Sequence, residues 1–274
     1  MHRTPAGAAT RLAVRLAVAF AMAVLIPVAA ASPAAAAERR PAAGPARFTD
    51  RQIVRGFLAV AFGAEYATGT TDRIRRFDGP VRVLVDAAGA PPDLAAARTA
   101  TVEAVVAEIG RGVQHLDIAT THDRADANLT ILIVRRRAFA ATVTAVFGPD
   151  RASTILRRLA PDCVSGFSRD EAFRIRQAAV ILVADTSDFA FRDCTIEETL
   201  QALGPINDTT LPWTMFNDAV RTGRFGRYDR YLLGLLYHPR MRPGMPRREA
   251  EAIARAALPD VRAFVDAGRS TPAR

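Results

Sequence analysis

The sequence predicts an α+β domain that contains a small mixed sheet and one long helix. Apolar residues recur at helical spacing across residues 93–110, which predicts the long helix. Short runs rich in Val, Ile and Leu occupy residues 81–85, 129–134 and 178–184 and are typical of strands. Since 50% of the chain is hydrophobic, the roughly 225 residues after the N-terminal segment can build one full core.

The first elements are predicted from caps and periodicity. Residues 48–61 contain the cap signal Thr49-Asp50 near their start and favour a helix. Residues 81–85 alternate and are rich in Val, so they favour a strand, and residues 89–93 form a turn. The long helix over residues 93–110 then ends at a glycine.

The middle of the chain is less regular. A short strand is predicted at residues 116–118 and a strong one at residues 129–134. Residues 138–174 give no clear pattern beyond a helix around residues 151–159. A second strong strand follows at residues 178–184.

The last third of the chain is predicted to be helical. Helices are expected at residues 195–203, where Gly204 ends the helix, at residues 228–237, and at residues 247–257 after Pro246. No internal repeat and no second domain boundary are visible. Residues 48–274 are therefore expected to form a single globular domain.

The N-terminus has the pattern of a secretory signal peptide. Residues 1–15 carry three arginines and no acid, residues 16–31 are apolar, and Ala35-Ala36-Ala37 supplies a small-residue end. A membrane-spanning helix needs about 20 apolar residues, and this core is shorter and contains Pro27. We expect residues 1–37 to be a signal peptide, which predicts export to the periplasm or extracellular space with no stable membrane span after cleavage.

A linker and a basic composition complete the general description. Residues 38–47 are rich in Ala and Pro and are expected to link the signal peptide to the domain. The net charge is +9 and every basic residue other than histidine is Arg. Because the arginines are scattered and no aromatic-basic module is present, the sequence does not favour a nucleic-acid partner.

The two cysteines of the chain predict a disulfide bond. An even cysteine count in an exported protein favours a bond between Cys163 and Cys194. Closing a loop of roughly 30 residues would stabilise the fold by about 3–4 kcal/mol in the chain-entropy account.

One segment has the spacing of a zinc site. Glu197, Glu198, Gln201, Gly204 and Asn207 fall at the positions of H-E-x-x-H-x-x-G-x-x-H, the metzincin signature. Residues four apart share one helix face, so two side chains can reach one ion. The glycine turns the chain so that a third ligand returns, and the Glu between the first two would hold a metal-bound water.

The surrounding chain resembles a zincin domain. A zincin has a long helix, an edge strand opening with Ala-Asp, a further strand, the active helix and a Met-containing turn beneath the metal. Here Ala125-Asp126 precedes a strand, and Trp213-Thr214-Met215-Phe216 falls where the Met-turn belongs. Residues 228–237 resemble the helix that follows that turn.

The chain also resembles the bacterial family named domain of unknown function 2927. The resemblance covers most of the mature chain. It rests on Glu197-Glu198, Gln201-Ala202-Leu203-Gly204-Pro205-Ile206-Asn207-Asp208, Phe216-Asn217-Asp218, Leu236-Tyr237-His238-Pro239-Arg240 and Pro243-Gly244-Met245. It implies a zincin-like fold with a degenerate active-site helix and no settled activity.

The departures from the zinc signature argue against a zinc peptidase. Glu197 and Gln201 replace the two helix histidines, and the third place offers Asn207 or Asp208. A Gln side chain is a poor zinc ligand. The histidines of the mature chain, His115, His122 and His238, are not at ligand spacing and are expected to be surface or packing residues. We expect no bound zinc and no other cofactor.

Four interpretations of the polar segment stay open. Glu197 and Glu198 could favour the dipole of a helix N-terminus, with Gln201 bonding in the core. The two acids and Asp208 could bind a hard cation such as calcium. Glu198 alone could serve as a general acid or base. A groove could instead bind a peptide or an envelope partner, lined by Trp213, Met215, Phe216 and Tyr237.

Two functions follow from these interpretations. The first is an exported, non-peptidase protein that binds or scaffolds in the cell envelope. The alternative is an exported hydrolase with a non-standard site that uses Glu198. Convergence of the polar side chains at an open cleft would favour the hydrolase, and burial in packed protein would favour the scaffold.

Overall fold

The computed structural model describes residues 47–63, 72–158, 162–217 and 219–268. The predicted signal peptide at residues 1–37 and all but the last residue of the predicted linker lie outside these ranges. Within them, no helix combines the length and the apolar character that crossing a membrane requires.

The helices are α1 (Asp50–Ala61), α2 (Pro92–Gly112), α3 (Arg136–Phe147), α4 (Pro149–Arg158), α5 (Asp188–Ala202), α6 (Arg227–Tyr237) and α7 (Arg247–Ala267). The strands are β1 (Val81–Gly89), β2 (Ile118–Thr121), β3 (Leu129–Val134), β4 (Cys163–Arg169) and β5 (Ile175–Val183).

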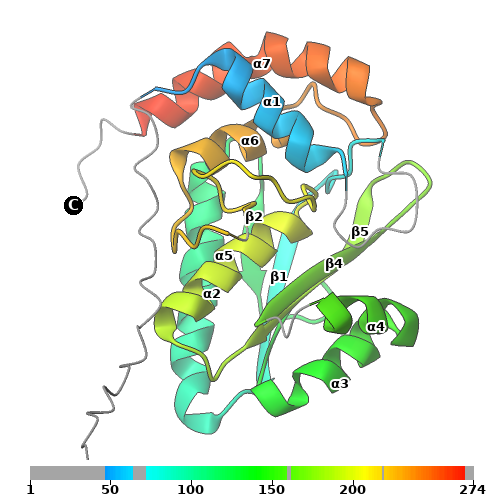
Figure 1. Cartoon of the computed structure of the whole chain (residues 1–274), viewed down its shortest axis with the longest axis vertical. Coiled ribbons are helices and arrows are strands. Elements are labelled where there is room, and N and C mark those ends of the chain that lie inside the picture. The colour runs from blue at the N-terminus through cyan, green and yellow to red at the C-terminus, as the bar shows by residue number, and fades with distance from the viewer. Residues whose placement is uncertain (1–46, 64–71, 159–161, 218, 269–274) are drawn as a thin grey trace, which may run out of the picture. The chain divides into compact units, whose positions relative to one another are not determined.

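The fold is a mixed α+β structure around one five-stranded sheet (Figure 1). The strand order is β2-β1-β3-β5-β4. All neighbours are parallel except β4, which runs antiparallel to β5. Strands β3 and β5 pair in register from Leu129 opposite Ala178 to Val134 opposite Val183. The prediction that the two strong strand patterns belong to one sheet is therefore confirmed.

The edge of the sheet differs from the expectation. The strand that follows Ala125-Asp126 is β3, and it lies in the middle of the sheet between β1 and β5. The edge strand next to α5 is β4, which no sequence pattern had predicted, and the same is true of α3. Its sequence, CVSGFSR, combines Ser and Gly with few apolar residues, so it lacks the alternation that identified the other strands.

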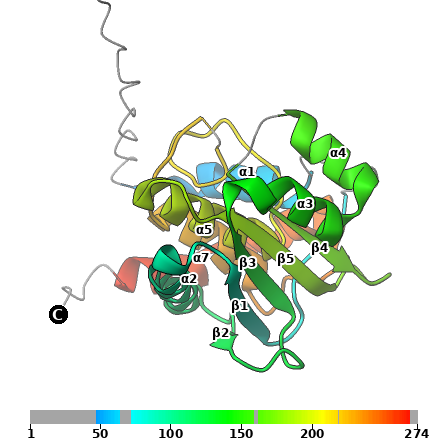
Figure 2. The same cartoon turned by 90° about the horizontal axis from the view of Figure 1, so that it is seen from below.

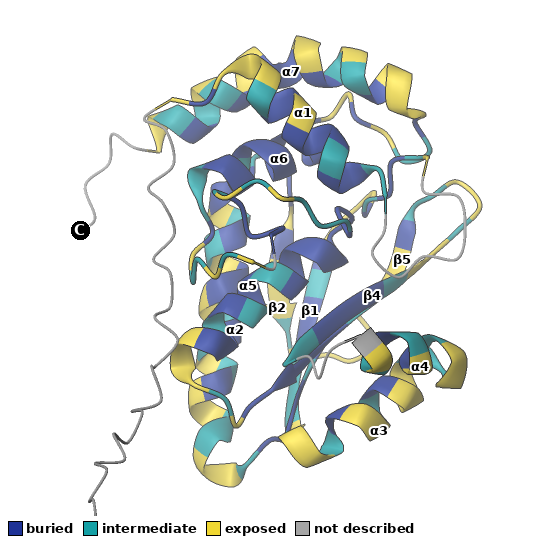
Figure 3. Ribbon diagram, viewed as in Figure 1, coloured by how far each residue is buried: buried dark blue, intermediate teal, exposed yellow. Residues whose placement is uncertain are grey.

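The main hydrophobic core lies on one face of the sheet. Leu129, Ile131 and Ile133 of β3 are fully buried there, and α1, α2, α5, α6 and α7 contribute to the same cluster. Figure 3 shows α5 and α6 buried over most of their surface, whereas α7 and α2 each keep an exposed side. Ile196 and Leu200 of α5, and Leu203 directly after it, are 0% exposed. These three residues are the apolar side that the sequence predicted to be buried.

A second, smaller cluster lies on the opposite face of the sheet. Phe139 and Val143 of α3 and Ala152 and Ile155 of α4 pack there. The sheet residues in this cluster include Val134, Val164, Ile181 and Val183. They alternate with the residues of the main core, as the side-chain period of two requires. Figure 2 shows α3 and α4 close to β4 and β5 and away from α2 and α7.

The helix that carries the candidate site is longer than predicted. It begins at Asp188, and the Ser187 side chain caps it by accepting a hydrogen bond from the Ala190 N–H at 3.2 Å. Thr195, the predicted start, lies inside the helix and donates its hydroxyl to the Phe191 carbonyl. A Thr can occupy either position, so the residue type alone did not identify the helix start. By contrast, the predicted Thr49 cap of α1 is confirmed by a capping box with Gln52.

Candidate functional site

The residues of the predicted site lie in the second half of α5. Glu198 is 8% exposed and Gln201 is 6% exposed, while Glu197 is half-buried. Because the helix begins at Asp188, the two acids lie in its third turn. The interpretation of Glu197 and Glu198 as N-terminal acids that favour the helix dipole is therefore wrong, since that effect is confined to the first turn.

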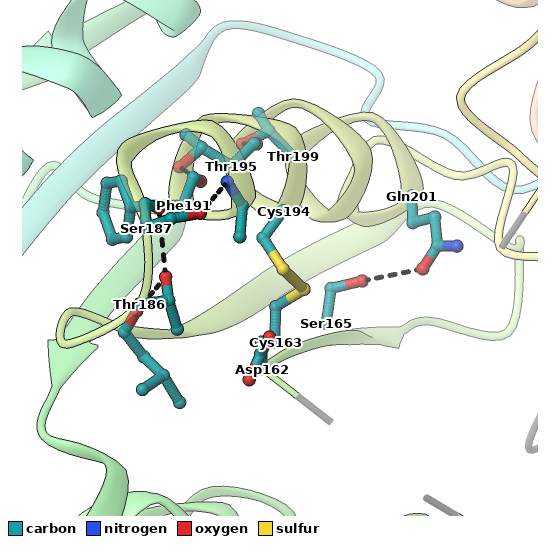
Figure 4. The surroundings of a disulfide bond; sticks show 12 residues. Asp162, Cys163, Ser165, Thr186, Ser187, Phe191, Cys194, Thr195, Thr199 and Gln201 are labelled. Atoms are coloured by element: carbon teal, nitrogen blue, oxygen red, sulfur yellow. Dashed lines mark hydrogen bonds between the residues drawn. A yellow bond between two sulfur atoms is a disulfide. The ribbon is translucent and has the colours of Figure 1, made fainter. Parts of the chain in front are cut away.

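Gln201 connects the edge strand to the segment that follows α5. The Ser165 hydroxyl of β4 donates to Gln201 Oε1 at 3.4 Å. Gln201 Nε2 in turn donates to Asp208 Oδ1 at 3.3 Å. Figure 4 shows Gln201 extending from α5 toward Ser165. Both ends of this amide are hydrogen-bonded. Nε2 is a donor to Asp208, so it offers no lone pair to a metal ion.

Asn207 does not join this group. Its Nδ2 donates to the Ala59 carbonyl of α1 at 2.9 Å and to the Asp208 carbonyl at 3.1 Å. The side chain also lies against Gly63. The metzincin spacing placed Asn207 at the third ligand position, but the structure brings Asp208 to Gln201 instead. The residue that converges with the helix is thus one position later than the pattern implied.

The turn after α5 depends on Gly204, as the sequence predicted. Its φ is +133°, a conformation available in practice to glycine. A Cβ atom at this position would lie 2.2 Å from the Arg75 carbonyl oxygen. The preceding Leu203 carbonyl accepts a hydrogen bond from the Tyr237 hydroxyl at 2.9 Å. The glycine therefore lets the chain pass close to neighbouring backbone and return Asp208 toward Gln201.

The predicted groove is not formed. Met215, Phe216 and Tyr237 are 2%, 0% and 2% exposed and belong to the main core. Trp213 is partly buried against the same core and packs near Phe48, with ring centroids 5.8 Å apart. Apolar and aromatic side chains are more often packed inside than exposed in a groove. The aromatic set thus supports the fold and does not line an open binding surface.

Asp229 holds the Met-containing segment in place, a role that was not among those predicted from the sequence. Its Oδ1 accepts hydrogen bonds from the Thr214 hydroxyl at 2.6 Å and the Met215 N–H at 3.1 Å. Its Oδ2 accepts from the Gly226 N–H at 3.1 Å. Burial raises the pKa of Asp229 to about 6, although these hydrogen bonds oppose the shift. The sequence did contain a signal for this role. Asp229 lies three residues after Gly226, the residue that precedes α6, and this is the position of a capping acid.

The buried carboxyl of Asp229 predicts a pH-dependent contribution to stability. Its pKa is about 6 in the folded state against 3.8 for the unperturbed side chain. Between these pH values the folded state therefore binds more protons than the unfolded state. The contribution is complete below the unfolded pKa and is lost as the pH rises through the folded pKa. Relative to Asp229→Asn, the wild-type free energy of unfolding should fall by up to about 3 kcal/mol between about pH 4 and pH 7. Urea unfolding of both proteins across this range measures the difference.

Asp170 supplies a control of opposite sign. Partial burial opposes the shift, but hydrogen bonds from Arg174 and Arg176 lower the pKa of Asp170 to about 2. Relative to Asp170→Asn, the wild-type stability should therefore fall as the pH drops from about 4 toward 2. A difference between wild type and Asp229→Asn that stays constant with pH would contradict the assignment of Asp229.

The disulfide bond joins the edge strand to α5. Cys163, the first residue of β4, is bonded to Cys194 of α5, and the two Cα atoms are 5.9 Å apart. Figure 4 shows this bond beside the Ser165–Gln201 contact. The predicted pairing is confirmed. Together the covalent bond and the hydrogen bond fix β4 on the helix at two points.

The described residues contain no group of three or more His, Cys, Asp or Glu side chains that could hold a metal ion. His122 is exposed. His238 is buried, its Nδ1 accepts from the Arg240 N–H at 3.2 Å, and its Nε2 lies 3.6 Å from Asp260 Oδ2. Burial lowers the pKa of His238, although the Asp260 carboxylate opposes the shift. His115 packs edge-on against His238, with ring centroids 6.2 Å apart, so these two histidines pack against each other as neighbours.

The comparisons with known proteins give one match. The model of a family described as "Protein of unknown function (DUF2927)" matches residues 50–256 of the 274-residue chain. This range includes the whole sheet, α5 and the Gln201–Asp208 contact. Neither the curated proteins nor the solved structures contain a match to the chain.

Proposed function

Because the chain belongs to the DUF2927 family, whose description names no activity, we propose a function from its structure. The protein is an exported, zincin-like binding protein of the cell envelope without peptidase activity. Its single domain begins near residue 48, and it pairs an extended segment of its partner with strand β4.

The order of the elements supports the zincin-like assignment. The long helix α2 follows β1 and precedes the other four strands, the antiparallel edge strand β4 comes later, and α5 carries the degenerate signature. The chain turns at Gly204, and the buried Met215 follows before α6. This is the arrangement that the resemblance to zincins implies, with β4 in place of the predicted edge strand.

The contacts of Gln201 are the observation that carries the non-peptidase assignment. This residue stands where the signature has its second histidine, and its amide bonds Ser165 on one side and Asp208 on the other. A hydrogen-bonded amide therefore connects β4, α5 and the turn that follows α5. A hydrolase that uses Glu198 has less support, because this side chain is buried in packed protein.

The position of β4 supports a binding role. It pairs with β5 on one side and is the last strand in the described order of the sheet. An unpaired strand edge offers backbone groups to an extended segment of another chain. The second half of β4 is accessible, with Phe167 half-buried and Ser168 and Arg169 exposed. Since the disulfide and Ser165 fix the first half of the strand on α5, the edge is held in a defined position.

Proline substitutions in β4 test this proposal. Adjacent residues of a strand direct their N–H groups to opposite edges, so Phe167→Pro and Ser168→Pro remove one outward and one β5-directed donor. An array of unstructured decapeptides is probed with purified residues 38–274, and binding is measured by fluorescence polarisation. We expect the wild type to bind a subset without cleaving it, and the variant that lacks the outward donor to bind at least about tenfold more weakly.

The opposite edge of the sheet provides the control. Thr120→Pro places the same residue in β2, the edge strand at the other end of the sheet, and should leave peptide binding unchanged. Circular dichroism shows which variants keep the fold. Three results would each reject the proposal. These are equal loss of binding in the β2 and β4 variants, retention of binding in both folded β4 variants, and cleavage of a bound peptide.

A further inference from the structure

A cavity lies on the face of the sheet opposite to Gln201. It has a volume of about 500 Å³. Its floor is formed by small residues of three adjacent strands, Thr130, Ala179 and Gly166, and its walls include Phe147 and Arg151. Ser165 contacts Gln201 on the side of the main core, and the next residue, Gly166, faces this cavity. The cavity is therefore separate from the degenerate signature. It borders the β4 edge of the proposed function, since Phe167 and Ser168 also line it, but strand pairing at that edge does not require the cavity to be occupied.

Arg151 of α4 brings a positive charge to this cavity. Its guanidinium carbon lies 5.1 Å from the centroid of the Phe147 ring. Within the described ranges no carboxylate forms an ion pair with it, whereas Arg174 and Arg176 both pair with Asp170. Burial lowers the pKa of Arg151, and no acidic neighbour counteracts that shift. Arg151 is half-buried, and a partly desolvated cation beside an aromatic ring gains more from pairing with an anion than a fully hydrated cation does.

Gly166 makes room for this guanidinium. A Cβ atom at Gly166 would lie 2.8 Å from Arg151 Nη2 and 2.9 Å from the Phe147 ring. The absence of a side chain therefore lets both groups lie directly against the sheet. Glycine weakens the interior of a strand and often marks a place where a ligand or another chain segment comes close.

Further polar groups surround the same space. Ser168 and Gln177, which pair across β4 and β5, line it together with Arg124. Arg124 bonds Asp86 at 3.2 Å, but its side chain is 75% exposed, so it can turn toward a ligand at little cost. Val146 and Leu132 supply apolar surface beside Phe147. The cavity thus combines two arginines, hydroxyl and amide groups, and an apolar wall.

We propose that this cavity is a binding site for a small organic anion that carries a carboxylate or phosphate group on an apolar body. Arg151 binds the oxyanion through its planar N–H groups, which match carboxylate and phosphate geometry. Arg124 adds a second positive charge, and the apolar body packs against Phe147. A volume of about 500 Å³ is in the range of small-molecule sites.

Calorimetric titration with three simple probes tests the proposal. Phenyl phosphate and benzoate carry the two oxyanions on an aromatic ring, and benzyl alcohol is a neutral molecule of similar shape. At least one anion should bind the wild type with a Kd of about 1 mM or below, and benzyl alcohol should bind at least about tenfold more weakly. Which anion binds more tightly distinguishes a phosphate ligand from a carboxylate ligand.

Two variants and one control locate the binding. Arg151→Met keeps the length of the side chain but removes its charge, and Gly166→Ala displaces the guanidinium from the sheet. Each should weaken binding of the preferred anion by at least about tenfold. Arg157→Met, at an exposed position of the same helix, should leave the Kd unchanged. The Tm of each variant confirms that it is folded.

Three results would overturn the proposal. The first is absence of binding by both anions at about 10 mM. The second is binding that persists unchanged in folded Arg151→Met. The third is equal affinity for benzyl alcohol, which would show an apolar cavity without anion recognition.

Discussion

Replacement of Glu197 and Gln201 by histidine is expected to create a zinc site in this protein. The two positions are four residues apart on α5 and share one helix face, so both imidazoles can reach one ion. Asp208 Oδ1 already lies 3.3 Å from Gln201 Nε2, so its carboxylate can complete a set of two His and one Asp. Three protein ligands with a water at the fourth position are typical of zinc sites that are open to substrate.

The expected gain is large because Gln201 is a poor zinc ligand and the variant supplies two imidazoles on one helix face. The Gln201 amide is neutral, and its nitrogen is occupied as a donor. We expect the Glu197→His, Gln201→His double variant to bind zinc at least about 100-fold more tightly than the wild type. Equilibrium dialysis followed by elemental analysis measures both proteins. Stoichiometric zinc in the wild type would contradict the proposal that it is not a zinc peptidase.

Two additional variants distinguish the structure from the sequence pattern. Adding Asn207→His should bring no further affinity, because this side chain points to the Ala59 carbonyl of α1. Adding Asp208→Asn should remove most of the gain. If the double variant folds but binds zinc no better than the wild type, α5 and its turn do not have zincin geometry. If Asn207→His is required instead of Asp208, the spacing is right and the turn differs from the structure.

Removal of the disulfide is expected to destabilise the domain by about 3–4 kcal/mol. Cys163 and Cys194 are 31 residues apart in sequence, so the bond restricts a long loop in the unfolded chain. Both side chains are partly buried and pack against the main core, so the Cys163→Ala, Cys194→Ala variant also loses some contact area. Urea unfolding of the oxidised wild type and the double variant measures the change.

Chemical reduction separates the bond from the packing. Reduced wild-type protein keeps both sulfur atoms but loses the constraint, so most of the destabilisation should appear on reduction alone. Because the bond fixes the start of β4 to α5, amide hydrogen exchange should also accelerate in β4 and change less in β3. A reduced protein within about 1 kcal/mol of the oxidised one would show that the bond adds little to this fold.

Local sequence patterns determined a large part of this structure. The apolar runs at residues 129–134 and 178–184 identified β3 and β5, and periodic residues identified α2 and α6. Glycine at position 204 predicted the turn after α5, because few other residues can adopt its conformation. The two cysteines predicted their own bond, since no other pairing exists. Each of these features depends on residue type and short-range spacing, which the sequence contains directly.

Tertiary packing decided the features on which the proposed function rests. The edge strand β4 has no strong pattern of its own and is defined by its pairing with β5. Spacing alone shows which residues share a face of α5, but it does not show that Asn207 turns to α1 while Asp208 turns to Gln201. The Met215 and Tyr237 side chains are buried by elements far away in sequence. The physical reason is the same in each case: the direction of a side chain after a turn depends on long-range contacts, which no local pattern records.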